Sequence, residues 1–251
     1  MLLGAQLYSL RDKTTTEEGF RETFRSMKEA GYESVQLSGG KACDPHFFAD
    51  LAEEYALPIN STHTAFDRIV NDTDRVIEEH KIFGSREVGI GALPAEYRDS
   101  VENLQKFIEI MREPVRKIRA AGLDFGYHNH HFEFFPLGDS CIYEYLINNT
   151  DWHFIVDVYW LAYAHVNPVS MMERLGHRVV NFHLKDMDAT EDRGITACGT
   201  GIIDFKPIIA VAEKIGVKNA FIEQDNAPDL GDSFGQMRLG AEMMLPQVHH
   251  A

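Results

Sequence analysis

The chain alternates between two apolar patterns from end to end, and this alternation restricts its fold more than any other feature. Short, apolar, partly β-branched segments are typical of buried parallel strands. Each is followed by a longer segment whose apolar residues recur with helical spacing. Eight segments of each kind within 251 residues predict an α/β fold, a (β/α)8 TIM barrel, as a single domain over residues 1–251.

The expected elements follow from these patterns. Strand-like segments cover 2–8, 34–37, 58–63, 86–90, 125–133, 154–157, 179–186 and 220–225. Helices are expected over 17–30, 45–55, 67–83, 100–121, 142–148, 168–175, 205–215 and 234–248. A doubly wound open sheet is the competing architecture, but no predicted strand is followed by a glycine-rich dinucleotide fingerprint.

Composition narrows the class of partner. The formal net charge of −15 argues against nucleic-acid binding, which needs a basic face, and favours a small-molecule substrate. Three widely spaced cysteines suit a reducing compartment rather than a disulfide framework. The first eight residues lack a basic leader, and no apolar run reaches the length of a membrane span. We therefore expect a cytoplasmic protein that binds neither nucleic acid nor membrane.

Four late strand-like segments end in metal-binding side chains rather than in ordinary turn residues. Asp157, His183 and Glu223 each stand at such an end, and the fourth end carries His128 to Glu133. A buried ionised carboxylate is costly unless a cation compensates it, so converging strand ends predict one divalent metal ion. Mixed carboxylate and imidazole ligands suit Mn²⁺, Zn²⁺, Mg²⁺ or Co²⁺, and the absence of thiolates argues against a closed structural zinc site.

The fourth ligand stays open between two residues. His128 and His130 share a face if this segment is a strand, because alternate residues of a strand point the same way. Glu133 stands at the strand exit, where a turn would aim it back over the site. We expect Glu133 as the fourth ligand, with His128 as the alternative.

Further polar and aromatic residues fall near the carboxyl ends of predicted strands, the face that carries the active site of a TIM barrel. As substrate-binding residues we expect Gln6, His63, His130, Lys185 and Trp160.

Several motifs together resemble the xylose-isomerase-like TIM-barrel superfamily, in its sugar phosphate isomerase/epimerase branch. The stretches that carry the resemblance are 6–12, 30–37, 127–134, 157–160, 183–186, 199–205 and 223–225. Such relatives typically hold a divalent metal on Glu, Asp, His and Glu from consecutive late strands, which implies Asp157, His183 and Glu223 as ligands. The chain departs from them at Tyr127–His128, where many relatives have a glutamate, and at Gln36, where they often have another.

The resemblance implies a divalent-metal-dependent isomerase or epimerase of a keto-sugar or sugar derivative, acting through an ene-diolate intermediate. Glu133, Glu223 or His128 would move the proton as general acid and base. Two alternatives remain. One is a lyase or dehydratase that eliminates water or an aglycone from a 3-keto-sugar in the same site, and the other is a non-catalytic sugar-binding protein. The family also leads us to expect a homo-oligomer, a dimer or tetramer.

Overall fold

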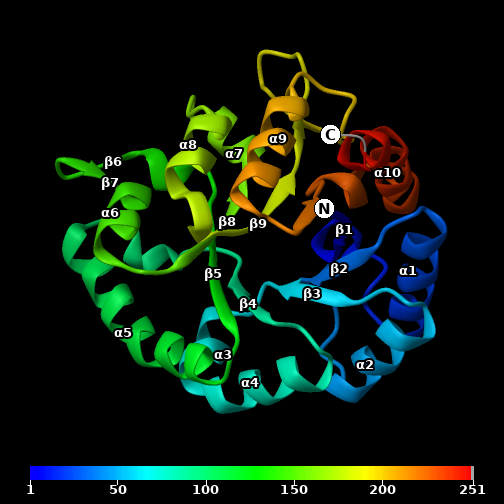
Figure 1. Cartoon of the computed structure of the whole chain (residues 1–251), viewed down its shortest axis with the longest axis horizontal. Helices are drawn as coiled ribbons and strands as arrows, with labels where there is room; N and C mark the ends of the chain where they lie inside the picture. The colour runs from blue at the N-terminus through cyan, green and yellow to red at the C-terminus, as the bar shows by residue number, and fades with distance from the viewer. Residues whose placement is uncertain (250–251) are drawn as a thin grey trace.

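In the computed structural model, which describes residues 1–249, a ring of parallel strands lies at the centre and helices surround it (Figure 1). The strands of the ring are β1 (Leu2–Gln6), β2 (Ser34–Leu37), β3 (Ile59–Thr62), β4 (Glu87–Ile90), β5 (Asp124–His128), β8 (His153–Asp157), β9 (Val179–Leu184) and β12 (Asn219–Ile222). Their hydrogen-bonded order runs β3-β2-β1-β12-β9-β8-β5-β4, and a parallel bridge between His63 and Gly89 nearly closes the ring. The predicted single-domain TIM barrel is confirmed, although residues 250–251 of the predicted range lie outside the described part.

The helices follow the predicted order with two local differences. They are α1 (Glu17–Glu29), α2 (Pro45–Glu54), α3 (Phe66–Asn71), α4 (Thr73–Ile82), α5 (Val101–Ala120), α6 (Ile142–Asn149), α7 (Val158–Tyr163), α8 (Pro168–Leu175), α9 (Phe205–Ile215) and α10 (Ser233–His249). The single helix expected over 67–83 is two helices, because Asp72 has a non-helical φ of −129°. Helix α7 is missing from the prediction, since its six residues are too short for a periodic signal.

Two short hairpins also lie outside the predicted pattern. One pairs β6 (Pro136–Leu137) with β7 (Ser140–Cys141), and the other pairs β10 (Asp186–Met187) with β11 (Ile195–Thr196). The second hairpin follows β9 directly, so it forms part of the wall above the carboxyl ends of the strands.

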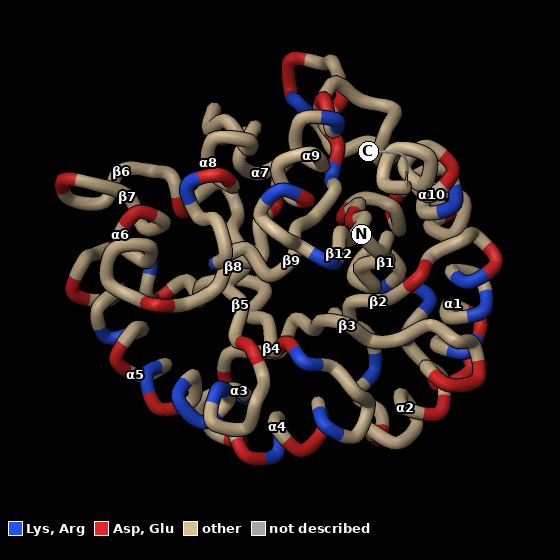
Figure 2. Tube along the Cα trace, viewed as in Figure 1, with Lys and Arg blue, Asp and Glu red and all other residues tan. Residues whose placement is uncertain are grey.

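The outer helices are amphipathic, which explains how they cover the barrel. Helix α1 is capped by the Thr16 side chain and buries Phe20, Phe24 and Met27. Acidic and basic residues are interspersed along α1, α4 and α5 at the rim of the molecule, and α2 carries acidic residues but neither Lys nor Arg, while the central strands have few charged residues (Figure 2). Among the described residues, no helix is long and apolar enough to cross a membrane.

Glycines on the inward face of the strands make room for large side chains inside the ring. A Cβ on Gly4 would lie 2.3 Å from the ring of Phe221, and one on Gly126 would lie 2.9 Å from Ile155. The interior at these positions is therefore closely packed, as in other barrels of this type.

Candidate active site

Four buried side chains converge at the carboxyl ends of neighbouring strands. His128 and Asp157 are the last residues of β5 and β8, His183 lies near the end of β9, and Glu223 directly follows β12. One potential ligand atom from each lies within 4.8 Å of the others. We call His128, Asp157, His183 and Glu223 the ligand group.

The distances inside the ligand group match a site built for a cation. His183 Nδ1 lies 2.8 Å from Glu223 Oε2 and 3.7 Å from Asp157 Oδ2, and His128 Nε2 lies 3.4 Å from Asp157 Oδ2. Within residues 1–249, His128 Nε2 and Asp157 Oδ2 are buried and make no hydrogen bond. Buried polar atoms are normally satisfied by hydrogen bonds. In the described part of the chain His128 Nε2 has none, and Asp157 Oδ2 has only an ion pair with Lys185 Nζ at 3.0 Å, so both atoms fit a metal ion that would bind them.

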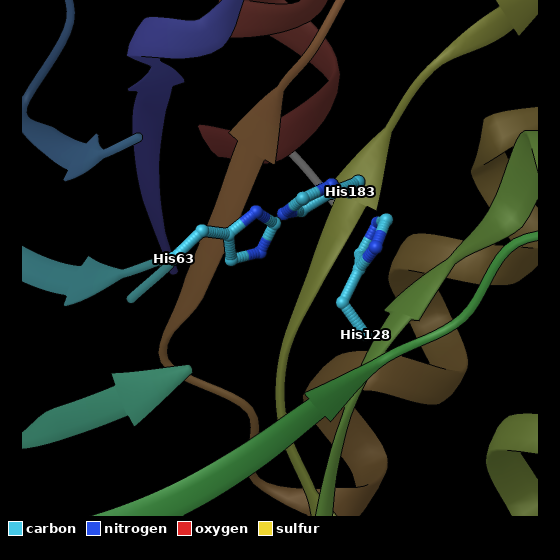
Figure 3. A group of neighbouring side chains, drawn as sticks. All are labelled: His63, His128 and His183. Carbon is cyan, nitrogen blue, oxygen red and sulfur yellow. The ribbon is translucent and has the colours of Figure 1, made fainter. Parts of the chain in front are cut away.

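A third imidazole extends this group. Figure 3 shows His63, His128 and His183 with their rings gathered around a common space, and their ring centroids lie 4.6 to 5.3 Å apart. Burial and the two neighbouring histidines lower the pKa of His63 well below its ordinary value. His63 is therefore neutral at physiological pH, and its buried Nε2 has no hydrogen-bond partner among the described residues. Such a nitrogen is able to bind a metal or a substrate hydroxyl.

Lys185 places a positive charge against the carboxylates of the ligand group. Its buried Nζ lies 2.8 Å from Glu223 Oε2, 3.0 Å from Asp157 Oδ2 and 3.0 Å from Asp225 Oδ2. Burial opposes ionisation of Asp157 and Glu223, but Lys185 and the adjacent imidazoles outweigh it, so the pKa of each carboxyl is lowered. Both carboxylates are charged at neutral pH, as metal ligands must be.

The structure does not bring Glu133 into the ligand group, contrary to our prediction for the fourth ligand. Glu133 Oε1 accepts a hydrogen bond from the Tyr127 hydroxyl at 2.9 Å, and Oε2 accepts one from His130 N at 2.8 Å. These two hydrogen bonds stabilise the loop that follows β5. The alternative residue, His128, occupies the fourth position of the group. Glu133 is also absent from the lining of the adjacent cavity, so its geometry gives no support to a catalytic role either.

The enclosed Glu133 carboxyl gives a testable pH dependence of stability. Burial raises its pKa to about 7 against the hydrogen bonds from Tyr127 and His130, whereas the unfolded chain titrates near the ordinary value of 4.5. The folded state therefore binds the extra proton, and its contribution to stability falls as pH rises from about 4.5 through 7. The free energy of unfolding should therefore decrease less with rising pH in Glu133→Gln than in the wild type, by up to roughly 3 kcal/mol. Free energies of unfolding measured in denaturant between pH 5 and 8 test this, and an unchanged pH slope in the variant would contradict it.

His128 and Glu223 of the ligand group line a cavity of about 630 Å³. All five residues predicted to bind substrate line it: Gln6, His63, His130, Lys185 and Trp160. Trp160 reaches the cavity from α7, the helix that the sequence did not reveal, and Gln6 Nε2 donates a 2.7 Å hydrogen bond to Glu223 Oε1.

Two charged residues of the cavity are not among the site residues predicted from the sequence. Asp225 lines the cavity beside Lys185, and Arg11 lines it while donating to the Asp225 carbonyl at 2.8 Å. Both belong to stretches that carry the family resemblance, and this was the available evidence for a role in the site. Residue type alone did not distinguish them from ordinary charged surface residues.

Asp186, beside Lys185, has a structural task. Its carboxylate accepts hydrogen bonds from the backbone N–H groups of Met187, Gly199, Gly201 and Ile203. A Cβ on Gly201 would lie 2.1 Å from the Met187 carbonyl oxygen, so a glycine is needed for this close approach. The Gly199-x-Gly201 motif is thus a turn whose backbone N–H groups bind the Asp186 carboxylate.

The fold and the ligand group together define an α/β-barrel protein with a candidate divalent-metal site at the carboxyl ends of its strands. Residues 24–244 match the family described as xylose isomerase-like TIM barrel, and the chain belongs to this family. No curated protein sequence matches the chain.

Several solved structures have a similar fold. A sugar phosphate isomerase/epimerase from Parabacteroides distasonis superposes with a TM-score of 0.79 at 22% identity, over 98% of this chain and 93% of that one. An L-ribulose 3-epimerase gives 0.76 at 13% identity, over 99% and 95%. The IolI protein, solved with a bound zinc atom, gives 0.75 at 12% identity, over 100% and 99%. At these identities the likeness establishes the fold alone.

Proposed function

We propose that this protein is a divalent-metal-dependent isomerase or epimerase of a keto-sugar or a close sugar derivative. The observation that carries the proposal is the buried ligand group, two members of which, His128 and Glu223, line the same cavity as the five residues expected to bind substrate. Membership of the xylose isomerase-like family is consistent with this chemistry, but a fold alone does not fix a reaction.

The donor set also indicates which ion it would hold. His128, His183, Asp157 and Glu223 would be the ligands, with His63 available as a further nitrogen donor. When bound, a divalent ion would act as a Lewis acid that polarises a carbonyl oxygen and lowers the cost of removing the adjacent proton. A set so rich in imidazole favours Zn²⁺ or Co²⁺ over Mg²⁺, which prefers oxygen ligands.

The residues of this chain would then bind the sugar and move the proton. Of the two carboxylates that line the cavity, Glu223 belongs to the ligand group, so we assign proton transfer to Asp225. Lys185 holds Asp225 by a 3.0 Å hydrogen bond, and the buried His130 Nδ1 has no partner within residues 1–249. His130, His63 and Lys185 line the cavity and would bind substrate hydroxyls, and the Trp160 side chain would form an aromatic wall for a sugar face.

Exchange of a substrate proton with solvent tests this function directly. We expect zinc- or cobalt-loaded protein to incorporate deuterium from D₂O at a carbon next to the carbonyl of a suitable ketose, followed by NMR. Asp225→Asn should slow the exchange by roughly 100-fold or more while the variant still binds metal, because loss of a general base typically costs a factor of this size.

The same measurement separates the alternatives. Formation of a product with ultraviolet absorbance, without recovery of a sugar isomer, would assign an elimination reaction instead. Tight sugar binding with no exchange across a panel of ketoses, in metal-loaded protein, would contradict the enzymatic proposal and favour a sugar-binding protein.

A further inference from the structure

A chain of buried polar side chains runs through the barrel interior beneath the ligand group. Gln36, Ser61, Glu87 and Asn181 come from β2, β3, β4 and β9, and all four are buried. TIM barrels usually fill this position with branched aliphatic residues, and buried polar groups cost stability unless they are paired. This series of hydrogen-bonded side chains therefore calls for a functional explanation. It is connected through Gln36 to one member of the ligand group, His183.

His183 is held from both sides of its ring. Nδ1 faces Glu223 and Asp157 of the ligand group, whereas Nε2 lies 2.8 Å from Gln36 Oε1. Because the Gln36 oxygen accepts and cannot donate, this contact keeps a proton on Nε2. The lone pair of the neutral ring is then on Nδ1, the nitrogen that points at the metal position.

If the Gln36 amide were rotated so that its oxygen and nitrogen exchanged places, it would no longer keep the proton on His183 Nε2. Ser61 prevents this rotation. Gln36 Nε2 donates to Ser61 Oγ at 2.9 Å. Ser61 has a single hydroxyl proton and gives it to Glu87 Oε1 at 2.7 Å, so towards Gln36 it can only accept. A flipped amide would present its NH₂ group to His183 and favour the ring proton on Nδ1, where a metal needs the lone pair.

Glu87 determines which groups donate and which accept along the whole series of hydrogen bonds. Its Oε1 accepts from both the Ser61 hydroxyl and the Asn181 side-chain amide. Burial raises the pKa of Glu87 to about 8. Protonation on Oε2 would leave Oε1 accepting from the same two donors, so the direction of the chain does not depend on the charge of Glu87.

We propose that Glu87 is a positioning residue of the metal centre, which acts through Ser61 and Gln36 to hold the His183 imidazole with Nδ1 ready to bind the metal. This inference rests on the proposed metal-dependent function and adds to it a residue that touches neither the ligand group nor the cavity. Residues that orient a metal-binding histidine typically affect metal affinity by 10- to 100-fold.

The test compares Zn²⁺ and Co²⁺ affinities, measured by competition with a chelator, in the wild type and four variants. We expect Glu87→Leu to lower the affinity by about tenfold or more, because Ser61 loses its acceptor. Glu87→Gln should bind like the wild type, since its amide oxygen can still accept both hydrogen bonds. Gln36→Glu added to Glu87→Leu should restore the affinity, because a carboxylate then accepts directly from His183 Nε2–H. Ser61→Ala makes a smaller deletion in the same chain and should reproduce the loss if Glu87→Leu folds poorly.

A spectroscopic measurement separates positioning from a merely structural role. In the wild type we expect a downfield, exchange-protected proton resonance from His183 Nε2–H, which should weaken or shift in Glu87→Leu and Ser61→Ala but not in Glu87→Gln. Metal binding by the wild type together with unchanged affinity and resonance in Glu87→Leu would overturn this inference alone. Failure of the wild type to bind either metal would overturn the proposed function and this inference with it.

Discussion

Replacing Asp157 by asparagine is expected to abolish metal binding. The purified wild type, incubated with Zn²⁺ and then desalted, should retain about one ion per chain by elemental mass spectrometry, and Asp157→Asn should retain almost none. The substitution removes the charge of a buried ligand but keeps a side-chain oxygen at the start of α7, where Asp157 Oδ1 accepts from Trp160 N at 3.0 Å. The loss should therefore come from the ligand group rather than from unfolding, and we expect affinity to fall roughly 100-fold or more.

Glu133→Gln is the matched control for this experiment. Glu133 is buried near the same site, but its two oxygens are bound to Tyr127 and His130 rather than directed at the ligand group. We expect this variant to keep its metal. Loss of metal in Glu133→Gln with retention in Asp157→Asn would show that the ligand set inferred from the geometry is wrong.

Replacing Lys185 by methionine is expected to make the metal-free protein much less stable and the gain in stability on metal binding larger. Three carboxylates, from Asp157, Glu223 and Asp225, lie within 3.0 Å of the Lys185 ammonium. Removing one partner of a buried ion pair typically costs about 3–5 kcal/mol because the other charge is left uncompensated. For a domain of this size that corresponds to a fall in Tm of roughly 6–20 °C.

A divalent ion bound to Asp157 and Glu223 would supply the missing positive charge. We therefore expect saturating Zn²⁺ to raise the Tm of Lys185→Met by more than it raises the Tm of the wild type, as differential scanning calorimetry can measure. Lys214→Met, which removes only the exposed pair with Glu173, should change Tm little with or without metal. Equal shifts on metal binding in Lys185→Met and in the wild type would show that the ammonium and the metal do not share these carboxylates.

Two features of the site illustrate how far the sequence leads. Asp157, His183 and Glu223 were predicted as ligands because each ends a buried strand, and the structure brings all three together. The choice between His128 and Glu133 could not be made in the same way. It depends on the short 3-10 turn Phe132–Phe134, which directs Glu133 back towards Tyr127 and the His130 backbone. The partners of Glu133 are at most six residues away in the sequence. The turn that brings them together has no periodic pattern, so the sequence does not reveal these hydrogen bonds.

The sequence alone determined the barrel, the order of its strands and helices, and the strand ends that carry the polar residues. These follow from local patterns, since strand and helix periodicity and the polar residues at strand ends can be read along the chain. Only the tertiary structure decided which groups meet. The ion pairs of Lys185 and the hydrogen bonds that link Glu87 to His183 join residues 25 to 147 positions apart. Such contacts depend on barrel closure and strand register, which place particular side chains at the same level inside the ring.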